Sequence, residues 1–105
     1  MPSFKENLET FPDAQGIARL ELVDAQGQVA ATVENRPGSQ GSLRLYLELA
    51  RRFGALTPEA ARAGCDLYAE HHEDARLNPG KHPNVDRLLA VAQAGTTLTI
   101  RTVRA

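Results

Sequence analysis

Hydrophobic and polar residues alternate with a period of two in three stretches, at residues 17–24, 29–34 and 96–103. In the first stretch, Leu20 and Leu22 lie on one side of the chain. Arg19 and Glu21 lie on the other side. Such alternation is typical of a strand with one buried face. A turn that ends with Gly27 separates the first two stretches, so we predict a β-hairpin.

A helical period predicts one short helix and three longer ones, at residues 4–11, 43–53, 57 to about 76, and 85–94. The expected N-terminal caps are Ser3, Thr57 and Asn84, and the expected stops are Pro12, Gly54 and Gly95. The stretch 43–53 also fits a strand, because leucine recurs at every second position from Leu43 to Leu49. We favour a helix, since Glu48 lies four residues before Arg52, a favourable spacing for a helical ion pair.

The order of these segments is α-β-β-α-α-α-β, which predicts an α+β fold with helices on one face of a small antiparallel sheet. If the three longer helices are antiparallel neighbours, the last strand runs parallel to the second. A sheet that is antiparallel throughout then needs the first strand in the middle. We therefore predict the strand order 2-1-3, and we expect residues 1–105 to form a single domain.

The composition excludes several classes of function. The 105 residues are 42% hydrophobic and 24% charged, with a net charge of -1, two Tyr, three Phe and no Trp. A net charge near zero does not attract a nucleic acid, and so few aromatic residues offer little surface on which bases could stack. No stretch reaches the roughly 18 apolar residues that a membrane span needs. We expect neither nucleic-acid nor membrane binding. The N-terminus lacks an apolar signal-peptide core and Cys65 has no partner for a disulfide, so we expect a cytoplasmic protein.

Residues 34–42 form a turn rich in glycine and serine between the hairpin and the next helix. Pro37 pushes Arg36 into an extended conformation, and either Ser39 or Ser42 can accept a hydrogen bond from the first turn of the helix. A helix start also attracts anions, although the phosphate-binding patterns G-x-x-x-x-G-K-[ST] and G-x-G-x-x-G are absent. A plain capped connection is the more common role of such a turn.

Antiparallel packing of the longer helices would bring the turn 35–42 to the same end of the protein as the loop 79–84. The second long helix would finish at that end too. Because two helix starts and several titratable groups converge there, we predict a ligand-binding site. Its expected residues are Asn35, Arg36, Ser39, Ser42, His71, Lys81, His82 and Asn84, with His72 beside them.

The sequence has no pattern that assigns metal or catalytic chemistry. His71, His72 and His82 could suggest zinc, but adjacent helical residues point about 100° apart and cannot easily share one ion. The histidines are better explained by hydrogen bonds to loop carbonyls or water. Cys65 and both tyrosines are expected in the core. We therefore expect no metal, no cofactor and no catalytic residue.

Three segments are distinctive: ENRPGSQGS at residues 34–42, AEH at 69–71 and PGKHPNVD at 79–86. Through these segments the chain resembles a small bacterial family that is described only as a domain of unknown function. The resemblance extends over nearly the whole chain. It implies a bacterial, cytoplasmic protein, and it implies no activity, cofactor or catalytic residue.

Two functions fit these expectations. The first is a small non-enzymatic binding or interaction module that associates with itself as a homodimer. A sheet covered on one face would leave Ile17, Val23 and Val103 open and two strand edges unpaired, and both features favour self-association.

The second function is a small enzyme or sensor that binds an anionic or phosphorylated metabolite at the two converging loops. Arg36, Lys81 and His82 would then neutralise the charge of the metabolite. A buried Arg36 would favour this second function. An Arg36 paired with Glu34 would favour the first.

Overall fold

The computed structural model describes residues 2–105, and this range contains three strands and five helices. In chain order they are α1 (Phe4–Leu8), β1 (Ile17–Val23), β2 (Val29–Glu34), α2 (Gln40–Phe53), α3 (Pro58–Tyr68), α4 (Glu70–Leu77), α5 (Pro83–Ala94) and β3 (Thr99–Arg104). The strands form an antiparallel sheet in the order β2-β1-β3. The predicted α+β class and the predicted strand order 2-1-3 are therefore confirmed.

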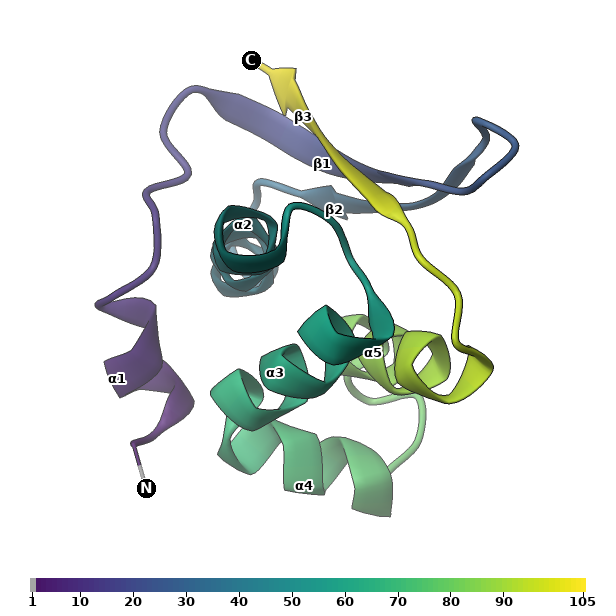
Figure 1. The fold of residues 1–105 in the computed structure, drawn as a ribbon. Coiled ribbons are helices and arrows are strands. Elements are labelled where there is room, and N and C mark those ends of the chain that lie inside the picture. Colours follow the sequence, from purple (N-terminus) through teal and green to yellow (C-terminus); the bar gives the residue numbers. More distant parts are fainter. Residues whose placement is uncertain (1) are drawn as a thin grey trace.

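Leucines of the central strand join the sheet to the helices. Leu20 and Leu22 of β1 are fully buried, and Leu20 pairs across the sheet with Val33 of β2. They belong to the same buried cluster as Leu45 of α2. Figure 1 shows the sheet along one side of the molecule, with α2 beneath it and α3, α4 and α5 farther away. Removal of this apolar surface from water holds the helices against one face of the sheet.

The opposite face of the sheet is charged. Glu21 of β1 pairs with Arg101 of β3 and with Arg19 of its own strand, and the hydrogen bond from Arg101 lowers the pKa of Glu21. The expectation of an open apolar face is wrong for two of its three residues. A register shift between Ile17 and Arg19 lets Ile17 pack against the core, and Val23 is buried. Val103 pairs with Arg19 and stays half-buried on the charged face.

Most of the predicted helix ends are confirmed. Ser3 forms a capping box with Glu6 at the start of α1, and the side chain of Thr57 caps α3. Gly54 ends α2 with a φ of 79°, and Gly95 ends α5 with a φ of 73°. These positions follow local rules, because a cap needs only a short polar side chain or a residue without Cβ.

Helix α1 is shorter than predicted, whereas strand β2 has the predicted bounds, and in both elements the last carbonyl group accepts a hydrogen bond from a side chain. Helix α1 ends at Leu8, whose carbonyl accepts a hydrogen bond of 2.7 Å from Arg44. Strand β2 ends at Glu34, whose carbonyl accepts a hydrogen bond of 2.6 Å from the hydroxyl of Ser39. The predicted side-chain cap of α2 by Ser39 or Ser42 is therefore absent: the hydroxyl of Ser39 donates to Glu34, and Oγ of Ser42 accepts from Tyr68.

The helix predicted from residue 57 to about 76 is divided at Ala69 into α3 and α4. Ala69 has φ 54° and ψ -119°, a conformation that residues other than glycine rarely adopt. The break lets the ring of Phe4 contact both Tyr68 of α3 and His71 of α4. These contacts come from a distant part of the chain, so the local sequence does not indicate the break.

We expect Ala69→Gly to raise the free energy of unfolding by about 1 kcal/mol. A residue with a Cβ stores about 1–3 kcal/mol of strain in this conformation, and the flexibility of glycine in the unfolded chain offsets about 0.5–1 kcal/mol of the relief. The matched control is Ala90→Gly at an exposed position of α5, which should lower the stability by about 1 kcal/mol. Urea unfolding measures both variants, and equal destabilisation of the two would show that Ala69 is unstrained.

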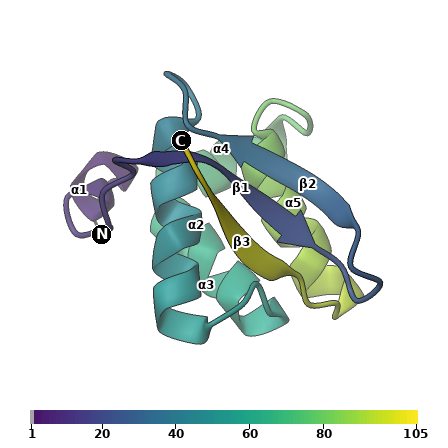
Figure 2. The ribbon, with the colours of Figure 1, turned by 90° about the horizontal axis from the view of Figure 1, so that it is seen from above.

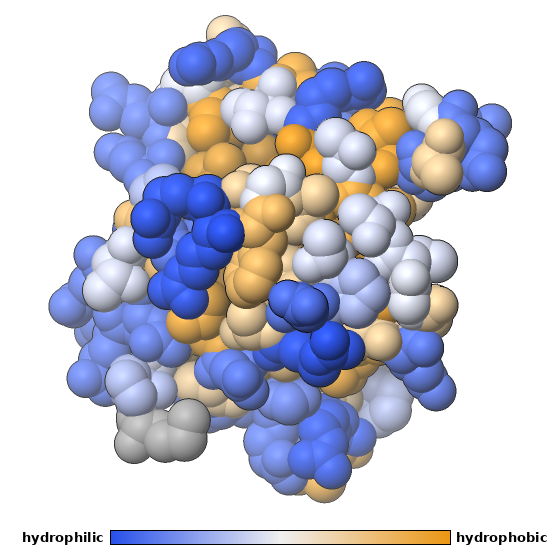
Figure 3. Space-filling view, in the orientation of Figure 1, coloured by the Kyte–Doolittle hydropathy of each residue, from blue (hydrophilic) through white to orange (hydrophobic). Residues whose placement is uncertain are grey.

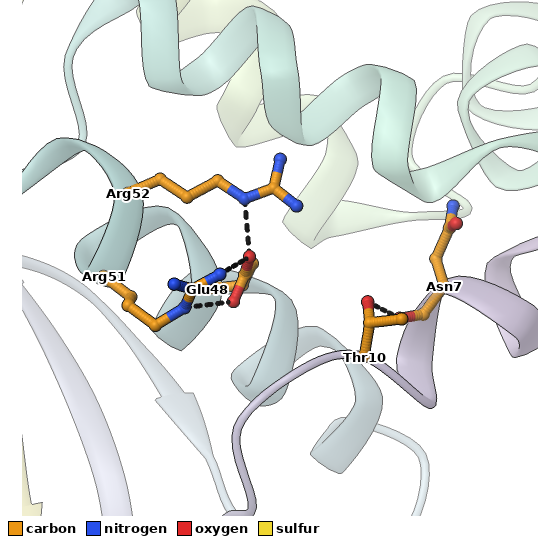
Figure 4. Close-up of polar contacts among 5 residues, drawn as sticks. All are labelled: Asn7, Thr10, Glu48, Arg51 and Arg52. Atoms are coloured by element: carbon orange, nitrogen blue, oxygen red, sulfur yellow. Dashed lines mark hydrogen bonds and ion pairs between the residues drawn. The ribbon is translucent and has the colours of Figure 1, made fainter.

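Glu48 of α2 is buried together with its charge. Its side chain is 1% exposed, and Arg51 and Arg52 of the same helix both donate to its carboxylate (Figure 4). The hydrogen bonds from Arg51, and then those from Arg52, lower the pKa of Glu48. The predicted ion pair between Glu48 and Arg52 is confirmed. With both oxygens paired, the ionised carboxylate is tolerated inside the protein.

The surface in the orientation of Figure 1 is hydrophilic over α1 and α4, and hydrophobic side chains reach it near α2 and along the edge of the sheet (Figure 3). The large hydrophobic residues that stay exposed are Val29, Phe53 and Leu77. They belong to three different elements, β2, α2 and α4. Together they do not make the apolar sheet face on which the expected homodimer was based.

Candidate functional site

A pocket of about 390 Å³ lies where α2 and α5 begin. Figure 2 shows the loop before α2 and the loop before α5 at the same end of the molecule. The residues that line the pocket are Phe4, Gly38, Gly41, Ser42, Tyr68, His71, Lys81, His82, Pro83, Asn84 and Val85. The alternating helix directions thus bring together segments that lie far apart in the sequence.

Part of the predicted site surrounds this pocket. The predicted residues in its lining are Ser42, His71, Lys81, His82 and Asn84. Asn35, Arg36 and Ser39 are not part of the lining, and neither is the neighbouring His72. The structure therefore gathers the predicted residues of the helix starts and of the loop 79–84, but not those at positions 35, 36 and 39 of the turn.

Asn35 and Ser39 hold the turn itself. The side-chain amide of Asn35 donates to the carbonyl groups of Ala14 and Ile17, at 3.1 and 2.7 Å. Arg36 is exposed and has no ion pair or side-chain hydrogen bond with any residue in the range 2–105. Because Arg36 is neither buried nor paired with Glu34, it does not distinguish between the two predicted functions.

Asp74 of α4 fixes one wall of the pocket. Its Oδ2 accepts from Nε2 of His82 at 2.7 Å and pairs with Nζ of Lys81 at 3.0 Å. The hydrogen bonds from His82 and then Lys81 lower the pKa of Asp74 from 3.8 to about 2. The bonds of ionised Asp74 to His82 and Lys81 therefore stabilise the folded state above pH 3.8, and this stabilisation is lost as the pH falls through about 2. Since Asp74 is ionised, Nε2 of His82 carries a proton and Nδ1 is left for another partner.

Tyr68 and Ser42 place a spare hydroxyl hydrogen in the pocket. Tyr68 is 2% exposed, and its hydroxyl donates to Oγ of Ser42 at 2.7 Å. Burial raises the pKa of Tyr68, so its hydroxyl stays protonated. The two hydroxyl groups carry two hydrogens but share one hydrogen bond, and neither donates to another acceptor in residues 2–105. One hydrogen of the pair is therefore free for a ligand.

Asn84 contributes a side-chain amide whose acceptor is already used. Its Oδ1 accepts from Arg87 at 2.8 Å, and its backbone carbonyl accepts from the hydroxyl of Tyr46 at 2.6 Å. Its Nδ2 donates to no residue in the described range. The predicted cap at Asn84 is wrong, because Pro83 is already helical and His82 occupies the cap position. Asn84 thus lies within the first turn and keeps its donors free.

The starts of both helices add backbone donors. The N–H groups of Gly41, Ser42 and Asn84 have no acceptor within residues 2–105. Unpaired N–H groups and the positive end of the helix dipole favour negative charge at such a position. Lys81 stands beside them with an exposed ammonium group. The polar groups left unpaired here are chiefly donors, so they suit a ligand that accepts hydrogen bonds.

Aromatic rings form another wall of the pocket. The ring of Phe4 stacks on Tyr68 at a centroid distance of 5.1 Å and meets the ring of His71 edge-on at 5.0 Å. The ring of His71 lies 5.3 Å from that of His82. A Cβ on Gly41 would lie 3.3 Å from the Phe4 ring, so the glycine lets α1 approach closely. Part of a ligand can therefore rest on apolar surface.

Sequence reasoning missed Phe4 and Tyr68 in the lining of the pocket, and it missed Asp74, which bonds to two lining residues, His82 and Lys81. Tyr68 and Asp74 lie three residues before and after His71, a spacing that would place all three on one face of a continuous helix. That spacing could have indicated that Tyr68 and Asp74 lie near the site. No sequence pattern indicated Phe4, because it contacts His71 from a distant part of the chain.

Cys65 has the structural role that was predicted for it. It is 5% exposed, and burial raises the pKa of its thiol to about 11, which makes it a poor nucleophile. Both tyrosines are buried, as expected. Within residues 2–105 no three His, Cys, Asp or Glu side chains gather as a metal-binding group. The expected absence of a metal stays a prediction.

These observations define a small α+β protein with a donor-lined pocket between two helix starts. The chain belongs to a family described as an uncharacterized protein conserved in bacteria (DUF2322), whose model matches residues 4–102. The predicted membership of a bacterial family of unknown function is confirmed. Comparisons with curated proteins and with solved structures found no match. Within residues 2–105, no helix is both long and apolar enough to cross a membrane.

Proposed function

We propose that the protein binds a small anionic molecule in the pocket between the starts of α2 and α5. The observation that carries this proposal is a set of unpaired hydrogen-bond donors around one cavity of about 390 Å³. They are the N–H groups of Gly41, Ser42 and Asn84, the amide of Asn84, the ammonium of Lys81 and a hydroxyl of the Tyr68–Ser42 pair. An anion would satisfy these donors together.

Binding is the part of the metabolite hypothesis that these contacts support. The pair formed by His82 and Asp74 has the contacts of an acid–base pair, in which a carboxylate orients an imidazole. The same contacts also hold the loop before α5 in place. We therefore propose a binding function and assign no reaction to it.

Self-association as a homodimer is a second proposal, supported by the outer strands β2 and β3, each of which pairs only with β1 in this range. Unpaired strand edges can join two copies of a chain. Light scattering after gel filtration decides it, and a monomer at high micromolar concentration would exclude it. The cytoplasmic location expected from the sequence is also a proposal, and fractionation of bacterial cells would test it.

Lys81→Ala is expected to weaken anion binding about tenfold, because a hydrogen bond to a charged group contributes about 1.5–3 kcal/mol. The fold should persist, since Asp74 keeps its hydrogen bond from His82. Titration with inorganic phosphate and with citrate, followed by amide NMR, measures the affinity. The matched control is Arg62→Ala on α3, which removes the same charge from an exposed position outside the pocket.

The position of the shifted amides decides the proposal. Binding in the pocket should move the resonances of Gly41, Ser42 and Asn84, whose N–H groups have no internal acceptor. If neither anion moves these three resonances at millimolar concentration, the protein has no anion site there. If the two variants lose affinity equally, the attraction comes from overall charge alone.

A further inference from the structure

We propose that the anion recognised in this pocket is the phosphate group of a small organic phosphate monoester. This inference rests on the anion-binding function proposed above and narrows it to one chemical class. It depends on the directions from which free donors reach the pocket, on the surrounding charges, and on the apolar wall beside them.

The free donors come from separate sides of the pocket. The start of α2 supplies the N–H groups of Gly41 and Ser42, and the start of α5 supplies the N–H and the amide of Asn84. Lys81 keeps ammonium hydrogens beyond the one directed at Asp74. A carboxylate offers two oxygens in one plane, whereas a phosphate monoester offers three terminal oxygens around phosphorus. Donors on several sides match the phosphate.

A hydroxyl group in the pocket suits the same kind of ligand. The hydroxyl of the buried Tyr68 donates to Oγ of Ser42, so the hydrogen that has no acceptor within residues 2–105 is that of the half-buried Ser42. An oxygen of a ligand that enters the pocket beside Ser42 would accept this hydrogen.

The charges around the pocket favour a dianion. Lys81 and the starts of α2 and α5 contribute positive potential, and His71 and His82 stand in the wall. Three acidic groups near the pocket have partners of their own: Asp74 bonds to His82 and Lys81, Glu70 to the N–H of Phe4, and Asp86 to the N–H of Gly80. A phosphate monoester carries a charge of about -1.5 to -2 near neutral pH, so it gains more from this site than a carboxylate does.

The remaining lining accommodates an organic group. Phe4, Pro83 and Val85 supply apolar surface, and the rings of Phe4 and His71 meet at 5.0 Å. The cavity of about 390 Å³ is near the lower end of small-molecule pockets, which span about 300–1,000 Å³. This size suits a phosphate with one small ring or one short chain attached.

Two probes with the same ring test the chemical class. Phenyl phosphate and benzoate differ in their anionic group, so calorimetric titration of each at about pH 7.5 compares phosphate with carboxylate directly. We expect phenyl phosphate to bind at least about tenfold more tightly, because it accepts several additional charge-assisted hydrogen bonds. Amide NMR should show that both probes move the resonances of Gly41, Ser42 and Asn84.

Asn84→Asp tests the arrangement of the donors. The new carboxylate can still accept the hydrogen bond from Arg87, and an acid in the first turn suits the helix dipole, so the fold should be kept. Phenyl phosphate should nevertheless bind at least about tenfold more weakly, because a donor is replaced by a negative charge. The control is Gln93→Glu, which adds the same charge at the exposed far end of α5 and should change the affinity less than about twofold.

Each outcome separates the inference from the function on which it rests. If benzoate binds as tightly as phenyl phosphate, the pocket is an anion site but not a phosphate site, and only this inference fails. If neither probe moves the pocket resonances, the anion-binding function fails as well. If Asn84→Asp and Gln93→Glu weaken binding equally, overall charge explains the affinity and the proposed donor arrangement is wrong.

Discussion

Gly64→Val is expected to lower the free energy of unfolding by at least about 3 kcal/mol. Gly64 lies on the buried side of α3, where α3 and α5 pack side by side (Figure 1). A Cβ at this position would lie 2.7 Å from Cδ1 of Leu88 and 2.9 Å from Cδ1 of Leu49. Both leucines are fully buried, so their side chains have no solvent-filled space into which to move.

The loss of stability should increase with the size of the side chain that replaces the hydrogen of Gly64. Gly64→Ala adds a methyl group, and its gain in helix propensity of about 1 kcal/mol offsets part of the steric cost. Gly64→Val adds two further methyl groups to the same contact. A loss of about 3 kcal/mol corresponds to a fall in Tm of roughly 12 °C or more for a chain of this size.

The control for this prediction is Arg62→Val, an exposed position two residues earlier on α3. Helix propensity alone should cost this variant no more than about 0.7 kcal/mol. Thermal and urea unfolding of the three variants and the parent protein give the comparison. If Gly64→Val is no less stable than Arg62→Val, the packing of α3 against Leu88 of α5 and Leu49 of α2 is looser than these distances indicate.

Features that depend on neighbouring residues could be predicted from the sequence. The central strand β1 follows from alternation that includes Leu20 and Leu22, and the ends of α3 and α2 follow from Thr57 and Gly54. The strand order needed only the additional rule that connected helices alternate in direction. The same rule placed the start of α2 beside the start of α5, which is why half of the pocket was expected.

Features that depend on distant contacts could not be predicted in this way. The break at Ala69 has no glycine or proline to mark it, and it is associated with contacts of Phe4 on both sides of the break. The turn residues Asn35 and Ser39 have the polarity of binding residues, but they bond to backbone carbonyls nearby. A sequence shows that a side chain can form hydrogen bonds and does not show which partner lies within reach.

Arg44 is a further case in which a distant contact determines the structure. It lies on α2, and its guanidinium donates to the carbonyl groups of Leu8, Phe11 and Pro12. Leu8 is the last residue of α1, and its carbonyl also accepts from the N–H of Phe11, whereas Phe11 and Pro12 follow the helix. One side chain thus donates both to the end of α1 and to the segment after it. The segment before β1 is therefore held to the helices largely through Arg44.

Arg44→Met should lower the free energy of unfolding by about 1–3 kcal/mol. Methionine keeps the apolar stem of arginine but removes the donor from the carbonyl groups of Phe11 and Pro12, while the carbonyl of Leu8 keeps only the N–H of Phe11. Urea unfolding measures the loss. The matched control is Arg62→Met, which should change the stability by less than about 0.5 kcal/mol because Arg62 is exposed.

Arg44→Met should also affect the pocket, because α1 carries the lining residue Phe4. Without Arg44, the remaining hydrogen bonds from α1 to α3 and α4 are those from Asn7 to the carbonyl of Leu67 and from Phe4 to Glu70. Hydrogen exchange should therefore show loss of protection in residues 4–8 before any other helix. Phenyl phosphate should bind several-fold more weakly, since the ring of Phe4 no longer forms a fixed wall. Unchanged exchange in α1 together with unchanged affinity would show that the contacts of Phe4 and Asn7 with α3 and α4 hold α1 without Arg44.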